Sequence, residues 1–265
     1  MRKYFKYFII FLSLNFPFST QVLSADCTDV KGAPATISSD CSGRLGVTGN
    51  SSNITINSGV RVSGQTSNDR YAIETTSGTN TTITNNGNIG PTDGNDVEDV
   101  ERFSIYHNTG TGSITAINNN GAMGVYENGS SSTGTVIWNK STIVNINNAA
   151  SGTMWSSGRN VIVNGAGGEI TKIDNDGSIT SDNKWTIKNI TGQIGEIDNS
   201  GTIEAAVVMG TNQTSNGEAA IRNYGVGEIT TITNSGTLKA LEQTIQIEAG
   251  RLKEERGESV PCRNH

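Results

Sequence analysis

The sequence predicts an all-β fold, a parallel β-helix solenoid of about six coils with a disulfide-stapled N-terminal cap. A ten-residue unit recurs along the chain, and each copy holds one short apolar strand and a corner. Hydrophobic residues make up only 33% of the chain, which is too little for a conventional globular core of this size. The isoleucines are nevertheless spaced too regularly for a disordered chain. Since one unit cannot bury its own hydrophobic face, the copies are expected to stack.

The clearest copy of the unit spans residues 194–203 and reads Ile-Gly-Glu-Ile-Asp-Asn-Ser-Gly-Thr-Ile. Its second isoleucine, Ile197, belongs to a series whose other members are Ile83, Ile117, Ile146, Ile173 and Ile232. A second, interleaved series carries Ile-x-Asn, at residues 137–139, 162–164, 187–189 and 221–223. Both series are short, rich in β-branched residues and bounded by Gly, Asn, Asp and Ser, as strands are.

The two series predict a coil with two well-defined strands and a variable third side. Each strand is expected to pair with its counterpart in the next coil, about 4.8 Å away. The return from the first series to the second varies in length, so the loops are expected to emerge on one side of the rod. The longest are predicted at residues 90–102, 124–136 and 211–218.

Residues 1–25 have the layout of a secretory signal peptide. Arg2, Lys3 and Lys6 form a positive n-region, an apolar stretch follows, and Ser24 and Ala25 provide a cleavage site. The apolar stretch is shorter than the roughly 20 residues of a spanning helix, and no later segment is apolar enough to span a membrane. The chain is therefore expected to be exported and to keep no transmembrane segment after signal removal. A retained N-terminal anchor is the alternative.

The rest of the chain divides into a predicted N-terminal cap at 26–52, a repeat domain at 53–240 and a C-terminal cap or disordered tail at 241–265. Cys27 and Cys41 are expected to form a disulfide, which an oxidising compartment permits. Asp26 directly precedes Cys27 and argues against a lipoprotein. Cys262 is left over, either free or available for an intermolecular bond.

The polar residues of the repeat are interpreted as corner residues rather than as a binding or catalytic site. Asparagine tolerates left-handed backbone, and stacked amides can bond one another in a ladder. The asparagines are Asn119, Asn148, Asn175, Asn199 and Asn234. A sugar-binding row is the functional alternative. The glycines that follow are expected to supply positive φ at a turn, and they are Gly121, Gly152, Gly177, Gly201 and Gly236.

Charge and metal-ligand patterns indicate neither nucleic-acid binding nor a cofactor. The net charge is −6, and no basic patch stands out beyond the first seven residues, whereas phosphate binding needs clustered Lys and Arg. An acidic loop contains Asp93, Asp96, Glu98 and Asp99, whose carboxylates suit Ca²⁺. The loop lacks EF-hand spacing, so a solvated loop is the preferred interpretation. No cofactor is predicted.

No catalytic residues are predicted. His107 has no patterned Ser or Asp partner, and His265 is the last residue. Asp174, Asp176 and Asp198 resemble the paired acids of a glycosidase, but neighbouring copies carry Thr or Asn at these places. A non-enzymatic protein is therefore expected, with a β-helical polysaccharide lyase or hydrolase as the alternative. The aromatic candidates for glycan contact are Trp138, Trp155 and Trp185, although packing explains them equally well.

A signal peptide followed by Ile-x-x-Ile-x-Asn-Ser-Gly-Thr-Ile units resembles the passenger region of bacterial autotransporters, the type V secretion proteins. The resemblance covers roughly residues 54–240. It implies a right-handed parallel β-helix that acts as a surface adhesin or scaffold, with an unknown surface, glycan or matrix ligand. It also implies localisation to the periplasm, the cell surface or the outside of the cell.

The resemblance also implies a C-terminal translocating β-barrel, which residues 241–265 are too few to form. The sequence is therefore expected to be either a truncated autotransporter or a stand-alone exported solenoid, and truncation is the preferred hypothesis.

Overall fold

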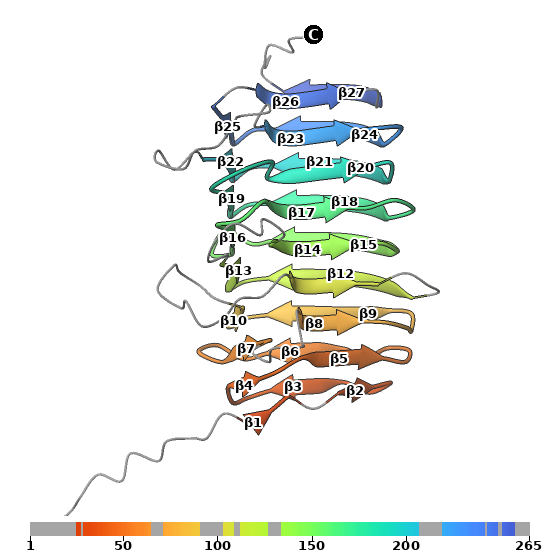
Figure 1. Ribbon diagram of the computed structural model, residues 1–265, viewed down its shortest axis with the longest axis vertical. Helices are drawn as coiled ribbons and strands as arrows, with labels where there is room; N and C mark the ends of the chain where they lie inside the picture. The colour runs from red at the N-terminus through yellow and green to blue at the C-terminus, as the bar shows by residue number, and fades with distance from the viewer. Residues whose placement is uncertain are drawn as a thin grey trace, which may run out of the picture.

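The computed structural model describes residues 25–27, 29–64, 71–90, 103–108, 112–126, 134–206, 219–241, 243–248 and 251–257. All regular secondary structure in these ranges is β-strand, and the 27 strands stack as a parallel β-helix (Figure 1). The predicted fold class is confirmed. Within the described ranges, no helix is long and apolar enough to cross a membrane.

Each coil contributes one strand to each of three nine-stranded parallel sheets, which we call sheets A, B and C. Sheet A consists of β1 (Ala25–Asp26), β4 (Cys41–Ser42), β7 (Arg61–Ser63), β10 (Asn88–Ile89), β13 (Ala122–Val125), β16 (Thr153–Ser156), β19 (Ser178–Ser181), β22 (Thr202–Ala205) and β25 (Thr237–Ala240). Sheet B consists of β2 (Val30–Lys31), β5 (Leu45–Thr48), β8 (Tyr71–Thr75), β11 (Phe103–His107), β14 (Thr135–Asn139), β17 (Asn160–Asn164), β20 (Ile187–Ile190), β23 (Ala219–Tyr224) and β26 (Gln243–Glu248). Sheet C consists of β3 (Ala35–Ile37), β6 (Ile54–Ile56), β9 (Thr81–Asn85), β12 (Ser113–Asn119), β15 (Thr142–Asn148), β18 (Glu169–Asn175), β21 (Gln193–Asn199), β24 (Glu228–Asn234) and β27 (Arg251–Gly257).

The isoleucine series of the repeat form columns through the core. Ile173 pairs in register with Ile146 on one side and with Ile197 on the other. All three side chains are fully buried. The Ile-x-Asn series does the same in sheet B, where Ile162 pairs with Ile187. Alternation along each strand therefore directs these isoleucines into the solenoid and the residues between them outward.

The third side of the coil is a regular sheet rather than an irregular return. Most strands of sheet A follow an Asn-x-Gly corner, and several of them bury apolar residues, such as Ile179 and Ile203. The long connections at 91–102 and 207–218 both join a sheet A strand to a sheet B strand. The predicted loop at 124–136 was too wide, since its ends belong to β13 and β14.

The predicted N-terminal cap is made of coil strands. Strands β1, β2 and β3 begin sheets A, B and C and pair in parallel with the next coil. The disulfide between Cys27 and Cys41 is present, with a Cα–Cα distance of 5.1 Å. Because it closes a short loop, it contributes roughly 2–4 kcal/mol to stability.

The solenoid contains nine coils rather than about six, counted over the described residues. The first coils were missed because they lack the complete Asn-x-Gly unit. At the other end, β26 and β27 pair with β23 and β24, so residues 243–248 and 251–257 continue the sheets where a cap or a disordered tail was predicted. The predicted signal peptide up to residue 24 and Cys262 lie outside the described residues.

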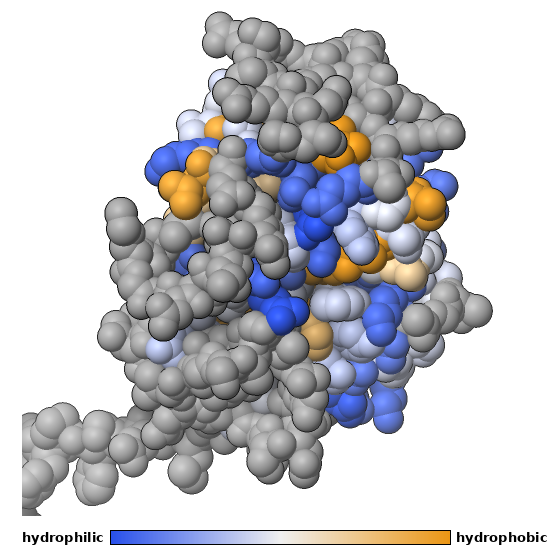
Figure 2. All heavy atoms as spheres, turned by 45° about the horizontal axis from the view of Figure 1, so that its top comes forward, coloured by the Kyte–Doolittle hydropathy of each residue, from blue (hydrophilic) through white to orange (hydrophobic). Residues whose placement is uncertain are grey.

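The described surface is mixed in polarity, with separate hydrophobic patches among hydrophilic residues on the side seen in Figure 2. The exposed large hydrophobic side chains belong to the last two coils. They are Tyr224, Val226, Leu241 and Ile247.

Candidate ligand-binding face

The predicted corner asparagines form a continuous hydrogen-bonded ladder at the end of sheet C. Asn148 Nδ2 donates to Asn175 Oδ1 at 2.7 Å, and Asn175 Nδ2 donates to Asn199 Oδ1 at 2.6 Å. The ladder begins earlier with Asn119, whose Nδ2 donates to Asn148 Oδ1, and continues to Asn234, whose Oδ1 accepts from Asn199 Nδ2. Asn85 adds a further rung that the sequence analysis did not include. The amides also donate to backbone carbonyls of the next corner, so the ladder ties each coil to its neighbour.

Sheet B ends in a second ladder. Asn139, Asn164, Asn189 and Asn223 are buried and linked amide to amide at 2.8–2.9 Å. The Ile-x-Asn pattern was the available signal for this ladder. Both ladders lie inside the solenoid, where a ligand cannot reach them, and their role is structural.

The corner glycines do not adopt positive φ, which corrects the prediction made for Gly121, Gly152, Gly177, Gly201 and Gly236. At Gly201 a Cβ would overlap the carbonyl oxygen of Gly177 in the preceding coil. The two backbones approach so closely because Thr202 N donates to that same carbonyl at 2.8 Å. Glycine is therefore required for the close stacking of corners rather than for left-handed backbone.

His107 occupies the place in the sheet B column where the next coil has Asn139. Its ring is 3% exposed, and Nδ1 shares a 2.5 Å hydrogen bond with Thr75 Oγ1. Burial lowers the pKa of His107 to about 4, although the nearby backbone carbonyls of Thr142 and Gly112 act in the opposite direction. Those carbonyls do not meet hydrogen-bond geometry at Nε2, which has no partner. The ring is thus neutral at pH 7 and faces the interior.

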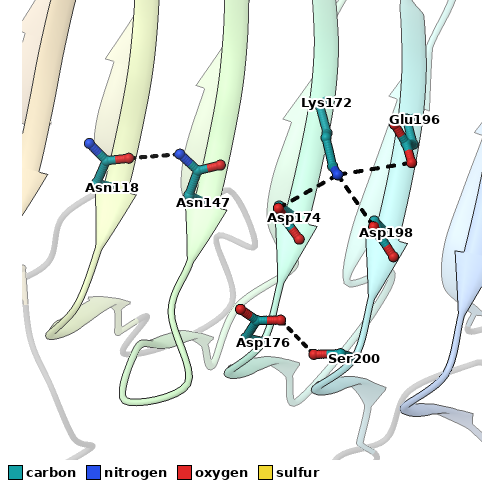
Figure 3. Close-up of polar contacts among 8 residues, drawn as sticks. All are labelled: Asn118, Asn147, Lys172, Asp174, Asp176, Glu196, Asp198 and Ser200. Carbon is teal, nitrogen blue, oxygen red and sulfur yellow. Dashed lines mark hydrogen bonds and ion pairs between the residues drawn. The ribbon is translucent and has the colours of Figure 1, made fainter.

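The outer face of sheet C carries a charged row in which one lysine is surrounded by carboxylates (Figure 3). Lys172 lies 3.3 Å from Asp198, 3.6 Å from Asp174 and 3.9 Å from Glu196. Burial by itself lowers the pKa of Lys172, but the hydrogen bond to Asp198 and the three carboxylates outweigh it and raise the pKa. Asp174 and Asp198, two of the carboxylates predicted as possible acids, therefore share one cation, and the third, Asp176, accepts a hydrogen bond from Ser200.

The same row continues through neutral amides toward the N-terminus. Asn147 Nδ2 donates to Asn118 Oδ1 at 2.7 Å, and Ser200 Oγ donates to Asp176 Oδ1 at 2.5 Å at the corner (Figure 3). A shallow groove of about 300 Å³ lies beside Asn118, Asn147 and Asp174. Its side chains largely satisfy one another.

The outer face of sheet B is aromatic over its middle coils. Tyr106 and Trp138 are neighbours in register, and Phe103 packs edge-on against Trp138 with 5.4 Å between ring centroids. Tyr71 stacks on Tyr106 at 4.6 Å. Lys140 Nζ lies 5.6 Å from the ring of Tyr106 and 6.0 Å from that of Trp138.

Cations replace the rings two coils further along the same row. Lys188 and Arg222 are neighbours in register, and both approach the ring of Trp185, at 4.4 Å and 3.9 Å from its centroid. Lys184 lies over the same ring at 5.5 Å. Arg222 also forms a 2.7 Å ion pair with Glu248.

Lys188 is the least compensated of these cations. Among the described residues no carboxylate forms an ion pair with it. Burial lowers the pKa of Lys188 to about 8, assisted by the like charges of Arg222, Arg159 and Lys184 and opposed only by Glu248. A positive charge is thus held where the protein itself disfavours it.

A groove of about 220 Å³ connects the rings to the cations. Phe103, Trp138, Arg159, Asn160 and Lys188 contribute to its walls. Asn160 is 5% exposed, and its Oδ1 has no hydrogen-bond partner. An unpaired buried acceptor is costly unless a donor reaches it, which makes the groove a place for a hydroxyl or another donor. We call Tyr106, Trp138, Arg159, Asn160, Lys184, Trp185, Lys188 and Arg222 the aromatic–cation face.

The other residues singled out from the sequence do not contribute to this described face. Trp155 belongs to sheet A, where its Nε1 donates to Asp182 at 2.9 Å. Asp93, Asp96, Glu98, Asp99 and His265 lie outside the described residues. Within the described ranges, no group of three or more His, Cys, Asp or Glu side chains is arranged to hold a metal ion.

The sequence analysis missed the basic character of the aromatic–cation face. Its cations come from three coils, and only Lys184 and Lys188 share one, so no large basic cluster is visible in the linear sequence. The signal was present in the middle position of the Ile-x-Asn series, which reads Trp138, Val163, Lys188 and Arg222 from coil to coil. Comparisons with protein-family models, curated proteins and solved structures find no match for the chain.

Proposed function

We propose that this protein is an exported, non-enzymatic β-solenoid, similar to an autotransporter passenger, that serves as a surface scaffold or adhesin. The aromatic–cation face is the observation that carries the proposal. It places rings and cations outward on consecutive coils of a rigid rod. The signal-peptide layout of residues 1–25 supports export to the periplasm, the cell surface or the exterior.

A face of this kind suits an extended ligand that runs along the rod. Parallel strands repeat about every 4.8 Å, so equivalent side chains of successive coils meet successive units of a polymer. Aromatic rings provide broad apolar contact and a rigid surface, which is suitable for the apolar faces of sugar rings. The proposed partner is therefore a glycan of a cell surface or matrix.

The proposal is tested by measuring binding of the purified exported chain to cells, matrix proteins and a glycan panel. We expect Trp138→Ala combined with Trp185→Ala to weaken binding at least tenfold. Trp155→Ala is the matched control, because this ring lies on sheet A. Absence of binding to every surface, or equal loss in the control, would count against the proposal.

A β-helical polysaccharide-active enzyme is the second candidate. The observation in its favour is that Asp174, which lines a groove on sheet C, is the neighbour in register of Asp198. The ion pairs of both carboxylates with Lys172 argue against free acid and base roles. Cleavage of any polysaccharide that is lost in Asp198→Asn would establish this alternative, and no turnover across the panel would dismiss it.

A further inference from the structure

We propose that the ligand of the aromatic–cation face is an acidic polysaccharide, whose carboxylate or sulfate groups bind between Lys188, Arg222 and Arg159. This inference rests on the proposed function and names the chemical class of its ligand. The chain as a whole carries a net charge of −6, so a local group of cations is the exception on this molecule.

The charges around Lys188 favour an anionic ligand. Lys188 and Arg222 are adjacent in register, and Arg159 and Lys184 are close enough to act on Lys188 as like charges. Glu248 is the one carboxylate that opposes them at Lys188, and it is already paired with Arg222 at 2.7 Å. Sheet C shows that the same fold can surround a lysine with three carboxylates. Lys188 is therefore left with a positive charge that an anion would neutralise.

Without a ligand, the environment of Lys188 disfavours its charged form. Its ammonium group is partly buried among other cations, which lowers its pKa to about 8. A bound anion would reverse this effect and raise the pKa, because an opposite charge favours the ammonium form. Strongly perturbed groups beside a groove are typical of functional sites. This supports the geometric argument.

The uncharged groups of the face suit the hydroxyls and apolar faces of sugars. Asn160 Oδ1, buried and unpaired in the wall of the groove, requires a donor, and sugar hydroxyls supply donors. Trp138 and Phe103 line the same groove and provide apolar surface. The spacing of about 4.8 Å between coils is close to the length that one pyranose residue adds to an extended chain. Charge, hydroxyls and apolar ring faces together describe an acidic sugar polymer.

The test compares polymers that differ in charge but share a backbone. Binding of the exported chain is measured by calorimetry at pH 6 to polygalacturonate, to its fully methyl-esterified form, to dextran sulfate and to neutral dextran. We expect at least one acidic polymer to bind and its neutral counterpart to bind at least tenfold more weakly. We also expect Lys188→Met combined with Arg222→Met to weaken binding of that acidic polymer at least tenfold.

Two controls separate binding from folding. Lys172→Met on sheet C removes one positive charge of the same kind and should leave binding unchanged. The thermal midpoint of Lys188→Met should not fall, because the variant removes a cation from among other cations. For the wild-type chain, binding should weaken several-fold between pH 7 and pH 10, as Lys188 loses its proton and its ability to attract an anion.

The outcomes distinguish this inference from the proposed function. Equal binding of a neutral polymer, with the loss in the tryptophan variants retained, would overturn the acidic class and leave the glycan-binding scaffold intact. Failure of both acidic polymers to bind would overturn the inference outright. Equally tight binding of a single-stranded oligothymidylate would point to nucleic acid instead, since aromatic and basic grooves also accept stacked bases.

Discussion

The outer faces of sheets B and C have the same backbone geometry and opposite charge arrangements. Both are nine-stranded parallel sheets whose buried columns of isoleucine end in an asparagine ladder. On sheet C, Lys172 has three carboxylates within 4 Å. On sheet B, Lys188 has three cations as its neighbours and a tryptophan ring beneath it.

The difference shows that the interior of a β-helix makes few demands on its exterior. Each outward row repeats along the rod, so a single substitution per coil decides which charges lie together. On sheet C the lysine already has carboxylates as partners, whereas on sheet B Lys188 lies mainly among other cations and would be stabilised by an anion. This is the reason for assigning binding to sheet B rather than to sheet C.

The largest effect is expected from the shared interior. Ile187→Ala in sheet B and Ile197→Ala in sheet C should each lower the free energy of unfolding by about 2–5 kcal/mol, because both side chains are fully buried and their removal leaves a cavity. Urea unfolding measures both variants. A loss below about 1 kcal/mol in only one of them would show that the two interiors are not equivalent.

The second largest loss of stability is expected from the asparagine ladders. Asn164→Ala and Asn175→Ala each leave an amide of the preceding coil without its acceptor and an amide oxygen of the next coil without its donor. An unsatisfied buried group costs about 1–3 kcal/mol. Chemical denaturation of the pair of variants is the measurement. Stability equal to that of the wild type would mean that the ladders contribute nothing beyond the backbone pairing.

The outward lysines should change stability in opposite directions. Lys172→Met removes ion pairs on sheet C and should lower the free energy of unfolding by up to about 1 kcal/mol. Lys188→Met relieves burial of charge and repulsion, while Arg222 remains on the ring of Trp185. It should leave stability unchanged or raise it. Thermal unfolding at pH 7 compares the two, and a fall in both variants would remove the contrast between the sheets.

The effect that is smallest at neutral pH concerns His107, which precedes Asn139 in the sheet B column. Because burial lowers the pKa of His107 from 6.5 to about 4, the unfolded chain binds a proton that the folded chain refuses between these values. Stability is therefore fully present above pH 6.5 and is lost progressively as the pH falls toward 4.

His107→Asn should reduce this loss, since an amide does not titrate and can extend the ladder toward Asn139. Urea midpoints of the wild type and the variant at pH 7 and pH 4.5 measure the difference. Parallel pH dependence in the two proteins would exclude His107 as the source.

The predictable part of the fold was the part that repeats. Ile146, Ile173 and Ile197 recur with a constant local pattern, so the sequence identified their strand and the parallel stacking of the coils. The coil count was too low because residues such as Leu45 and Val47 form buried coil strands without the repeat pattern. The glycines were correctly predicted at corners, but the predicted positive φ was wrong. They are required by contact with the preceding coil, which a sequence pattern within one unit does not reveal.

The candidate face, unlike the repeat, could not be predicted from a recurring pattern. Arg159, Lys188 and Arg222 are far apart in the chain, and the loops between coils vary in length, so their alignment depends on register. The parallel solenoid was predictable from the repeat alone, because a short apolar strand that cannot bury itself must stack on its copies. Which outward side chains lie together depends on the folded chain, because pairing between strands brings side chains of separate coils into one charged surface.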